Sequence, residues 1–263
     1  MNPDWRARYD LAVEAAEKAA QIAQGYFPEG DPADFAARVE WKLDRSPVTA
    51  GDRAAEAFLR NRIINAFPRD GFLGEEYGEK PGDSGFRWVV DPIDGTRNFM
   101  RGMALWGTLV GVEHRGEAIA GAAVMPSLGH TWRALRGDGA FRDGRRLRVS
   151  DTASLDDAVL ACSSLSGFFK AGREAQFLEL ARRTQRQRAF GHFYGFVLVA
   201  DGAIDVMVEH GLHVWDVAAV APIIEEAGGR FTDWDGRATI HRTDVVASNG
   251  RLHDETLRIL NAV

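Results

Sequence analysis

The spacing of apolar residues predicts two helices near the start of the chain. Over residues 5–24 the apolar positions fall on one helical face, at Leu11, Ala15, Ala19 and Ile22. Beyond this helix, the β-branched and aromatic residues over 36–43 favour a strand. Thr49 and Asp52 have the spacing of a capping box, and they therefore predict the start of a second helix.

The middle of the chain is rich in predicted strands, and its second half alternates strands with helices. Strands are expected over 72–73, 87–90, 105–113, 117–125 and 130–136. Later strands over 158–162, 204–208, 229–232 and 244–248 alternate with helices over 172–187, 193–201, 215–227 and 251–261. This alternation predicts a layered α/β architecture. Since no linker-like stretch interrupts it, we expect one domain with tightly packed halves, 1–145 and 146–263.

Two apolar runs in the first half end at acidic residues. The run 72–73 leads to Glu75, and the run 88–90 leads to Asp91 and then Asp94. The proline directly after Asp91 fixes the backbone, while the glycine directly after Asp94 permits an unusual turn. This spacing suits a turn that presents two carboxylates together, as Mg²⁺ with its oxygen ligands requires. Taken alone, each segment also fits a solvated loop or a simple turn.

The residues after Asp94 favour a phosphate site. Thr96 could cap a short helix that begins at Arg97, and the amides of Gly95 and Thr96 would then carry positive partial charge. Hard oxygen ligands beside such an anion site suit a Mg²⁺ ion that bridges to phosphate and activates a water. The alternative for residues 91–96 is a turn with an ordinary helix cap.

A further acid lies far downstream, at the start of the helix expected over 215–227. Asp216 occupies an N-cap or first-turn position, where a carboxylate stabilises a helix without any role in function. Pro222 lies inside the same segment and should bend the helix or loosen its first turns.

Composition and charge narrow the classes of function. The net charge of -6 disfavours a general nucleic-acid or anionic-membrane binder. The single cysteine, Cys162, excludes an intrachain disulfide and fits a reducing compartment. The first ten residues lack the apolar segment that a secretory signal would have, so we expect none, and no apolar run approaches the ~18 residues of a membrane span. We therefore expect a soluble, cytoplasmic protein with neither nucleic acid nor a membrane as its partner.

The acidic segments together resemble the motifs of the inositol monophosphatase family. GEE at 74–76, DPIDGT at 91–96 and WD at 215–216 agree with that family in order and spacing. Lys42 and the segment 48–52 resemble further family elements, so the resemblance spans essentially the whole chain. It implies a layered αβαβα sandwich, dependence on Mg²⁺ (two or three ions) and inhibition by Li⁺. It also implies a homodimer that acts on a small phosphorylated metabolite.

The same resemblance assigns roles to matching residues. The implied metal ligands are Glu75, Asp91, the Ile93 carbonyl, Asp94 and Asp216. Contacts to phosphate or substrate are implied at Asp94, Gly95, Thr96, Glu209 and Asp216. The Thr96 hydroxyl and Glu75 would orient the attacking water, and Asp52 would be hydrogen-bonded behind Thr96.

Several segments resemble the histidinol-phosphatase branch of the family, among them 94–102, 163–168 and 191–196. We therefore predict hydrolysis of L-histidinol phosphate to L-histidinol, a reaction of histidine biosynthesis. His192 stands where that branch carries an aspartate, and it either faces the leaving group or bonds locally at a helix start. Residues 212–216 are closer to inositol-type members, so inositol 1-phosphate is the alternative substrate. A second alternative is a catalytically competent relative that regulates RNA metabolism.

Overall fold

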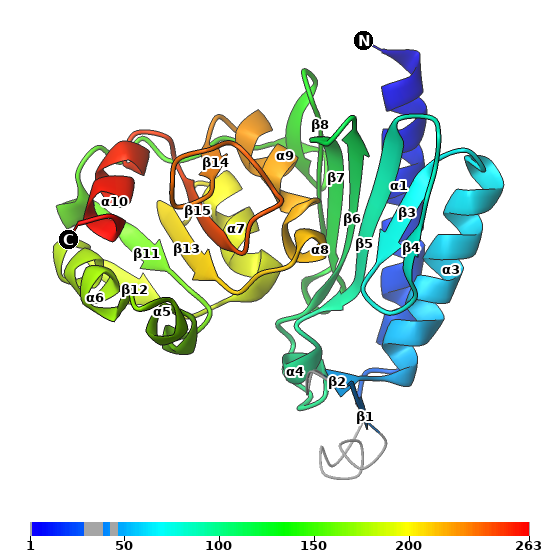
Figure 1. Cartoon of the computed structure of the whole chain (residues 1–263), viewed down its shortest axis with the longest axis horizontal. Helices are drawn as coiled ribbons and strands as arrows, with labels where there is room; N and C mark the ends of the chain where they lie inside the picture. Colours follow the sequence, from blue (N-terminus) through cyan, green and yellow to red (C-terminus); the bar gives the residue numbers. More distant parts are fainter. Residues whose placement is uncertain (1, 29–38, 43–46, 263) are drawn as a thin grey trace.

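Five layers of secondary structure alternate between helices and sheets in the computed structural model, which describes residues 2–28, 39–42 and 47–262. Helices form the two outer layers and the central layer, and a β-sheet lies on each side of the central helices (Figure 1). The αβαβα sandwich implied by the sequence is therefore confirmed. Among the residues described, no helix has the length and apolarity that crossing a bilayer requires.

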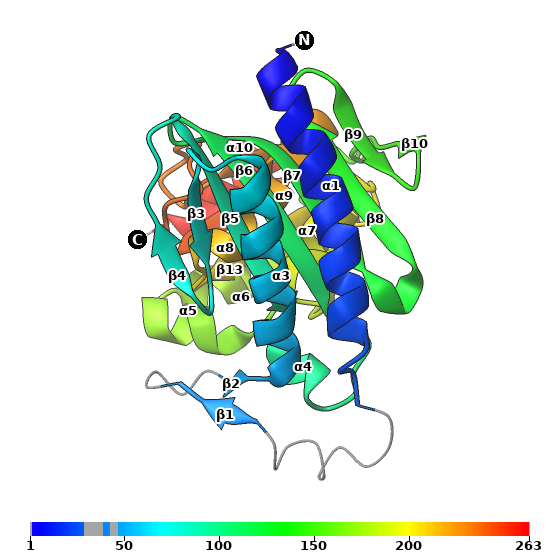
Figure 2. The same cartoon turned by 90° about the vertical axis from the view of Figure 1, so that its right-hand side faces the viewer.

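The first sheet has the strand order β10-β9-β8-β7-β6-β5-β3-β4. Its strands are β3 (Gly71–Gly74), β4 (Gly78–Lys80), β5 (Phe86–Asp94), β6 (Gly107–His114), β7 (Glu117–Met125), β8 (His130–Leu135), β9 (Gly139–Arg142) and β10 (Arg145–Arg146). Helices α1 (Pro3–Gln24) and α3 (Ala50–Ala66) cover its outer face (Figure 2). The buried alanine face of α1 lies against β6 and β7, which explains the predicted helical spacing.

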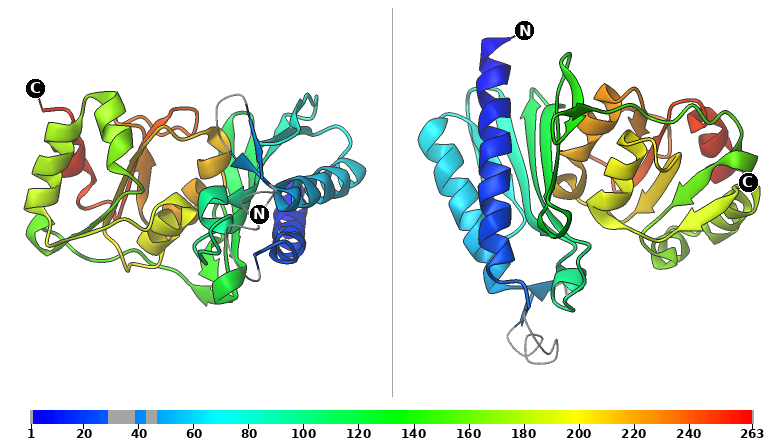
Figure 3. Two further views of the ribbon diagram at one scale, coloured as in Figure 1. Left: turned by 90° about the horizontal axis from the view of Figure 1, so that it is seen from below. Right: turned by 180° about the vertical axis from the view of Figure 1, so that it is seen from behind.

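The second sheet has the order β12-β11-β13-β15-β14. Its strands are β11 (Val159–Ala161), β12 (Arg186–Arg188), β13 (Val206–His210), β14 (Arg230–Thr232) and β15 (Asp244–Ser248). The central layer holds α7 (His192–Ala200), α8 (Val214–Val217) and α9 (Val220–Glu226), and the outer layer α5 (Leu165–Ala171), α6 (Glu174–Arg183) and α10 (His253–Leu260) (Figure 3). Five short elements complete the described part of the fold: β1 (Glu40–Trp41), β2 (Pro47–Val48), α4 (Thr96–Phe99) and the 3₁₀ turns Pro126–Leu128 and Leu155–Asp157.

Glycines in the first sheet allow the central helices to approach it very closely. A Cβ atom on Gly121 would overlap the carbonyl oxygen of Ala219. A Cβ atom on Gly111 would lie 2.7 Å from the carbonyl carbon of Ala218. Backbone therefore touches backbone where β6 and β7 meet the junction between α8 and α9, and only glycine fits there.

Most predicted elements are confirmed within a residue or two. The helix over 5–24 and the strands over 117–125 and 244–248 are present. The capping box is also confirmed, because the Thr49 amide donates to Asp52 Oδ2 at 2.8 Å and the Asp52 amide donates to Thr49 Oγ1 at 3.3 Å. Of the strand predicted over 36–43, only Glu40–Trp41 forms one, and 36–38 and residue 43 lie outside the described residues.

One helix prediction was wrong in extent, and another helix is interrupted, as Pro222 led us to expect. The helix predicted over 172–187 ends at Arg183, and Arg186–Arg188 instead forms the edge strand β12. The helix predicted over 215–227 is divided into α8 and α9 at Ala218 and Ala219. Pro222 explains this break, since it has no amide hydrogen for the Ala218 carbonyl and its ring crowds that oxygen.

We predict that Gly121→Ala lowers the free energy of unfolding by about 1–3 kcal/mol, because the added methyl group has no space against Ala219. Urea unfolding would measure the change. Gly71→Ala is the matched control in the same sheet, since its methyl group would meet its nearest neighbours at an ordinary 3.5 Å. Equal stability losses in the two variants would contradict the close approach of the layers.

Candidate metal and phosphate site

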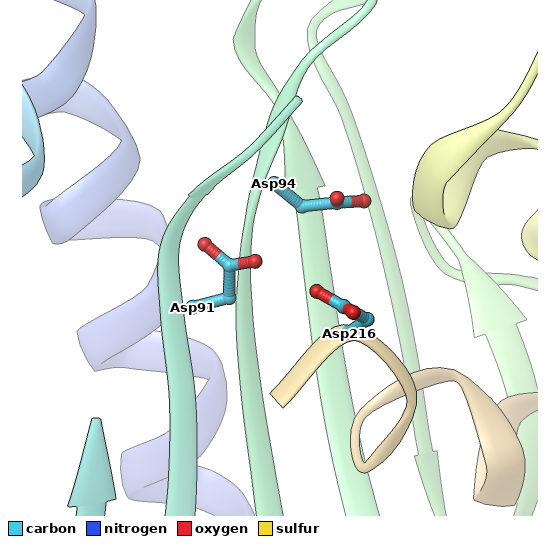
Figure 4. Close-up of side chains that lie close together, drawn as sticks. All are labelled: Asp91, Asp94 and Asp216. Carbon is cyan, nitrogen blue, oxygen red and sulfur yellow. The ribbon is translucent and has the colours of Figure 1, made fainter. Parts of the chain in front are cut away.

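Three aspartates, two from the first sheet and one from the central helical layer, converge on one point. Asp91 and Asp94 lie at the end of β5, while Asp216 lies in α8 (Figure 4). One carboxylate oxygen from each residue lies within 4.8 Å of the other two. Asp91 and Asp94 are buried, and Asp216 is half-buried. The arrangement brings together residues more than 120 positions apart in the sequence.

A bulge in β5 places Asp91 and Asp94 on the same face of the sheet. Residues three apart in a regular strand point to opposite faces. Here Asp91 pairs with Leu109 and Asp94 with Gly107, so three steps along β5 match two steps along β6. The extra residue reverses the alternation and turns both carboxylates toward the central layer. The Pro92 carbonyl inside the bulge accepts a hydrogen bond from Thr108 Oγ1 at 2.8 Å.

The electrostatics of the cluster favour a bound cation. Burial raises the pKa of Asp91 well above its usual range, and the carboxylates of Glu75 and Asp94 raise it further. Burial and the neighbouring Asp94 raise the pKa of Asp216 in the same direction. Several carboxylates that oppose one another's ionisation become compatible when a cation lies between them. The donor set consists of oxygen atoms alone, which fits a hard ion such as Mg²⁺.

The loop after Asp94 differs in detail from the predicted helix cap. The N-cap of α4 is Gly95, with φ of 93°, and the helix begins at Thr96 rather than at Arg97. Thr96 therefore does not cap this helix. Its hydroxyl lies 3.0 Å from the Ile93 carbonyl oxygen and 3.4 Å from Asp52 Oδ1. Asp52 is fully buried behind Thr96, and burial raises its pKa to about 7.

Glu75 lines the same pocket, but the structure does not bring it into the aspartate cluster. Its Oε1 forms an ion pair with Lys42 Nζ at 3.0 Å. The same ammonium group lies 2.8 Å from Glu76 Oε1. Lys42 thus places a positive charge between the two adjacent glutamates at the edge of the pocket.

The start of α7 contacts Asp94 from the other side of the pocket. The Phe193 amide donates to Asp94 Oδ2 at 2.5 Å, and His192 Nδ1 lies 3.2 Å from Asp94 Oδ1. His192 has a positive φ of 53°, and its amide donates to Ser163 Oγ at 3.0 Å. His192 therefore lines the pocket, and its bonds with Ser163 and Asp94 join it to segments 29 and 98 residues away rather than to its own helix start.

The pocket has a volume of about 260 Å³ and is formed by both halves of the chain. Of the residues singled out from the sequence, those that line it are Glu75, Asp91, Ile93, Asp94, Gly95, Thr96, His192, Glu209 and Asp216. Glu209 lies on β13 and accepts a hydrogen bond from the Ser163 amide. Burial raises the pKa of Glu209 to about 7.

Sequence reasoning missed Glu56, a fully buried carboxylate on α3. Its two oxygens each accept a backbone hydrogen bond at 2.8 Å, from Glu76 and from Tyr77. Burial raises the pKa of Glu56 to about 7. An available signal was its position four residues after Asp52, which places both acids on one face of the helix.

Comparison with known proteins shows the family to which the chain belongs. The model of the inositol monophosphatase family matches residues 4–263. A histidinol-phosphatase of Streptomyces coelicolor is 44% identical over 85% of this chain and 87% of its own length. A histidinol-phosphatase of Mycobacterium tuberculosis is 42% identical over 96% of this chain and 97% of its own. The solved structure of an inositol monophosphatase from Zymomonas mobilis has a TM-score of 0.87 and 30% identity, and the match covers 99% of this chain and 100% of the other.

The raised pKa of Glu209 predicts a pH-dependent stability. The folded state favours the protonated carboxyl, so stability is lost as pH rises from 4.5 to about 7. In metal-free protein we expect the wild type to lose up to about 3 kcal/mol relative to Glu209→Gln across this range. Urea unfolding of both proteins in the presence of a chelator would measure the difference. A difference that stays constant with pH would contradict the burial of an ionisable Glu209.

Proposed function

The chain belongs to the inositol monophosphatase family, and we propose that it hydrolyses a phosphate monoester, histidinol phosphate, in a Mg²⁺-dependent reaction. The observation that carries this proposal is the convergence of Asp91, Asp94 and Asp216 beside the Gly95–Thr96 loop. Relatives 42% and 44% identical over most of the chain are named histidinol-phosphatases, which supports this substrate. We also propose that the protein is a cytoplasmic homodimer.

The residues that would hold the metal all offer oxygen atoms as ligands. Asp91, Asp94 and Asp216 would provide carboxylate oxygens, and Glu75 and the Ile93 carbonyl would add to them. Bound Mg²⁺ would neutralise phosphate charge and lower the pKa of a water molecule. Glu75 would exchange its ion pair with Lys42 for this role, a small displacement because Glu75 already lines the pocket.

The Gly95–Thr96 loop would receive the phosphate. Its backbone amides lie at the start of α4, on the same pocket wall as Asp94. The Thr96 hydroxyl directs its hydrogen toward Ile93 or Asp52, which leaves oxygen lone pairs to accept a hydrogen bond from water. Thr96 and Glu75 would in this way orient the attacking water, and a nearby carboxylate would receive its proton.

The leaving alcohol would lie against residues of the second half of the chain. Glu209 and His192 line that part of the pocket together with Ser163. The Glu209 carboxylate is only 5% exposed, so a positively charged partner would stabilise it strongly. The amino group of histidinol would provide that charge. Inositol 1-phosphate remains the second candidate, since its neutral hydroxyl groups can donate hydrogen bonds to the same carboxylate.

We expect Asp94→Asn to lower kcat/KM by more than about 100-fold, because the variant loses a metal-binding charge at the centre of the site. Steady-state hydrolysis of histidinol phosphate with Mg²⁺ would measure it. Asp205→Asn is the control: Asp205 is 5% exposed and accepts a hydrogen bond from the Val159 amide at 2.7 Å, outside the pocket. Activity retained in a folded Asp94→Asn protein would contradict the proposed metal site.

The choice of substrate has its own test. We expect the wild type to hydrolyse histidinol phosphate with a higher kcat/KM than inositol 1-phosphate. Glu209→Gln should reduce kcat/KM for histidinol phosphate by about 10- to 100-fold, because one hydrogen bond between charged groups is lost. The same substitution should reduce kcat/KM for inositol 1-phosphate less. Parallel phosphate-release assays on both substrates would show this. Faster turnover of inositol 1-phosphate by the wild type would reverse the assignment.

A further inference from the structure

The buried carboxylate of Glu56 lies behind the active-site loop that follows β3. Glu56 is 0% exposed and lies on α3, one helical turn after Asp52. A carboxylate buried this completely is costly unless hydrogen bonds compensate for the lost solvation. The resemblance to known phosphatases gave no role to this residue, so its presence in the interior requires another explanation.

Glu56 accepts two hydrogen bonds from the turn between β3 and β4. The Gly74 and Gly78 positions pair across the two strands, and residues 75–77 form the turn between them. Within this turn, the amides of Glu76 and Tyr77 each donate to one oxygen of Glu56 at 2.8 Å. The carboxylate thus fixes the backbone immediately after Glu75.

Contact with Gly74 fixes the backbone immediately before Glu75. A Cβ atom on Gly74 would overlap Oε1 of Glu56, so the carboxylate lies directly against the glycine backbone. Glu56 therefore contacts the chain on both sides of Glu75. This explains why a glycine precedes Glu75, although its φ does not lie in the left-handed region.

We propose that Glu56 is a positioning residue, which holds the 75–77 turn so that Glu75 can reach the metal site. Asp52 lies behind Thr96, and Glu56, one turn later, lies behind Glu75. Helix α3 would thereby support both groups that orient the attacking water. The inference rests on the proposed function in one respect, the role of Glu75 as a metal ligand.

The test is Mg²⁺ binding by Glu56→Gln in the absence of substrate, measured by isothermal titration calorimetry. The amide nitrogen of glutamine cannot accept a hydrogen bond, so one backbone amide of the turn loses its partner. We expect Mg²⁺ affinity to fall by about 10- to 100-fold. Activity should recover when Mg²⁺ is raised to saturation, whereas a Glu75→Gln enzyme should not recover.

Glu113→Gln is the matched control. Glu113 is also a buried glutamate, with 1% exposure, and it forms an ion pair with Arg87. Arg87 lies near the start of β5, whereas Asp91 lies near the other end of that strand. Both variants should lower the melting temperature, but only Glu56→Gln should weaken Mg²⁺ binding. Gly74→Ala gives a second route, since its methyl group would displace the Glu56 carboxylate and should weaken Mg²⁺ binding similarly.

The outcomes separate this inference from the proposed function. Wild-type Mg²⁺ affinity in folded Glu56→Gln and Gly74→Ala proteins would overturn the inference and leave the phosphatase assignment intact. Mg²⁺ binding that weakens as expected, in a protein that hydrolyses neither candidate phosphate, would support the inference and remove the substrate assignment. A wild type that binds no Mg²⁺ would overturn both.

Discussion

The contact between the central helices and the glycines of the first sheet is the constraint on which the site depends. Gly111 and Gly121 allow the backbone at Ala218 and Ala219 to touch the sheet directly. Asp216 lies two residues before that contact, and Asp91 lies on the strand next to β6. Side chains between the layers would hold them farther apart. The direct backbone contact therefore brings Asp216 within reach of Asp91 and Asp94.

This close approach places negative charges where they destabilise the fold. Burial and mutual repulsion raise the pKa values of Asp91 and Asp216, so the site is a strained part of an otherwise apolar interface. The surrounding core offsets that cost, since Val89, Leu109 and Val217 are fully buried near the carboxylates. An arrangement unfavourable for stability but favourable for a divalent cation is typical of a functional site.

The sequence predicted those features that depend on local chemistry. The carboxylates of Asp91 and Asp94 were expected to lie together because of their spacing, although at a turn rather than at a bulge in β5, and Thr49 was expected to begin a helix because of its capping box. It did not predict the bulge in β5, which depends on pairing with β6, or the contact of Asp94 with the start of α7. Such features follow from tertiary packing between distant segments, and no periodicity in a single segment encodes them.

The two halves of the pocket contribute different chemistry. In the proposed reaction, groups for the metal, phosphate and water would come from the end of β5, the start of α4 and the turn after β3, and Asp216 would be added from α8. Groups that would face the leaving alcohol come from β13 and the start of α7, where Glu209 and His192 lie. Because Asp94 accepts a hydrogen bond from the Phe193 amide, the end of β5 and the start of α7 are held in a fixed position relative to each other. A substitution at Glu209 would therefore alter the preferred alcohol while the proposed hydrolytic groups keep their geometry, whereas one at His192 would also remove a contact with Asp94.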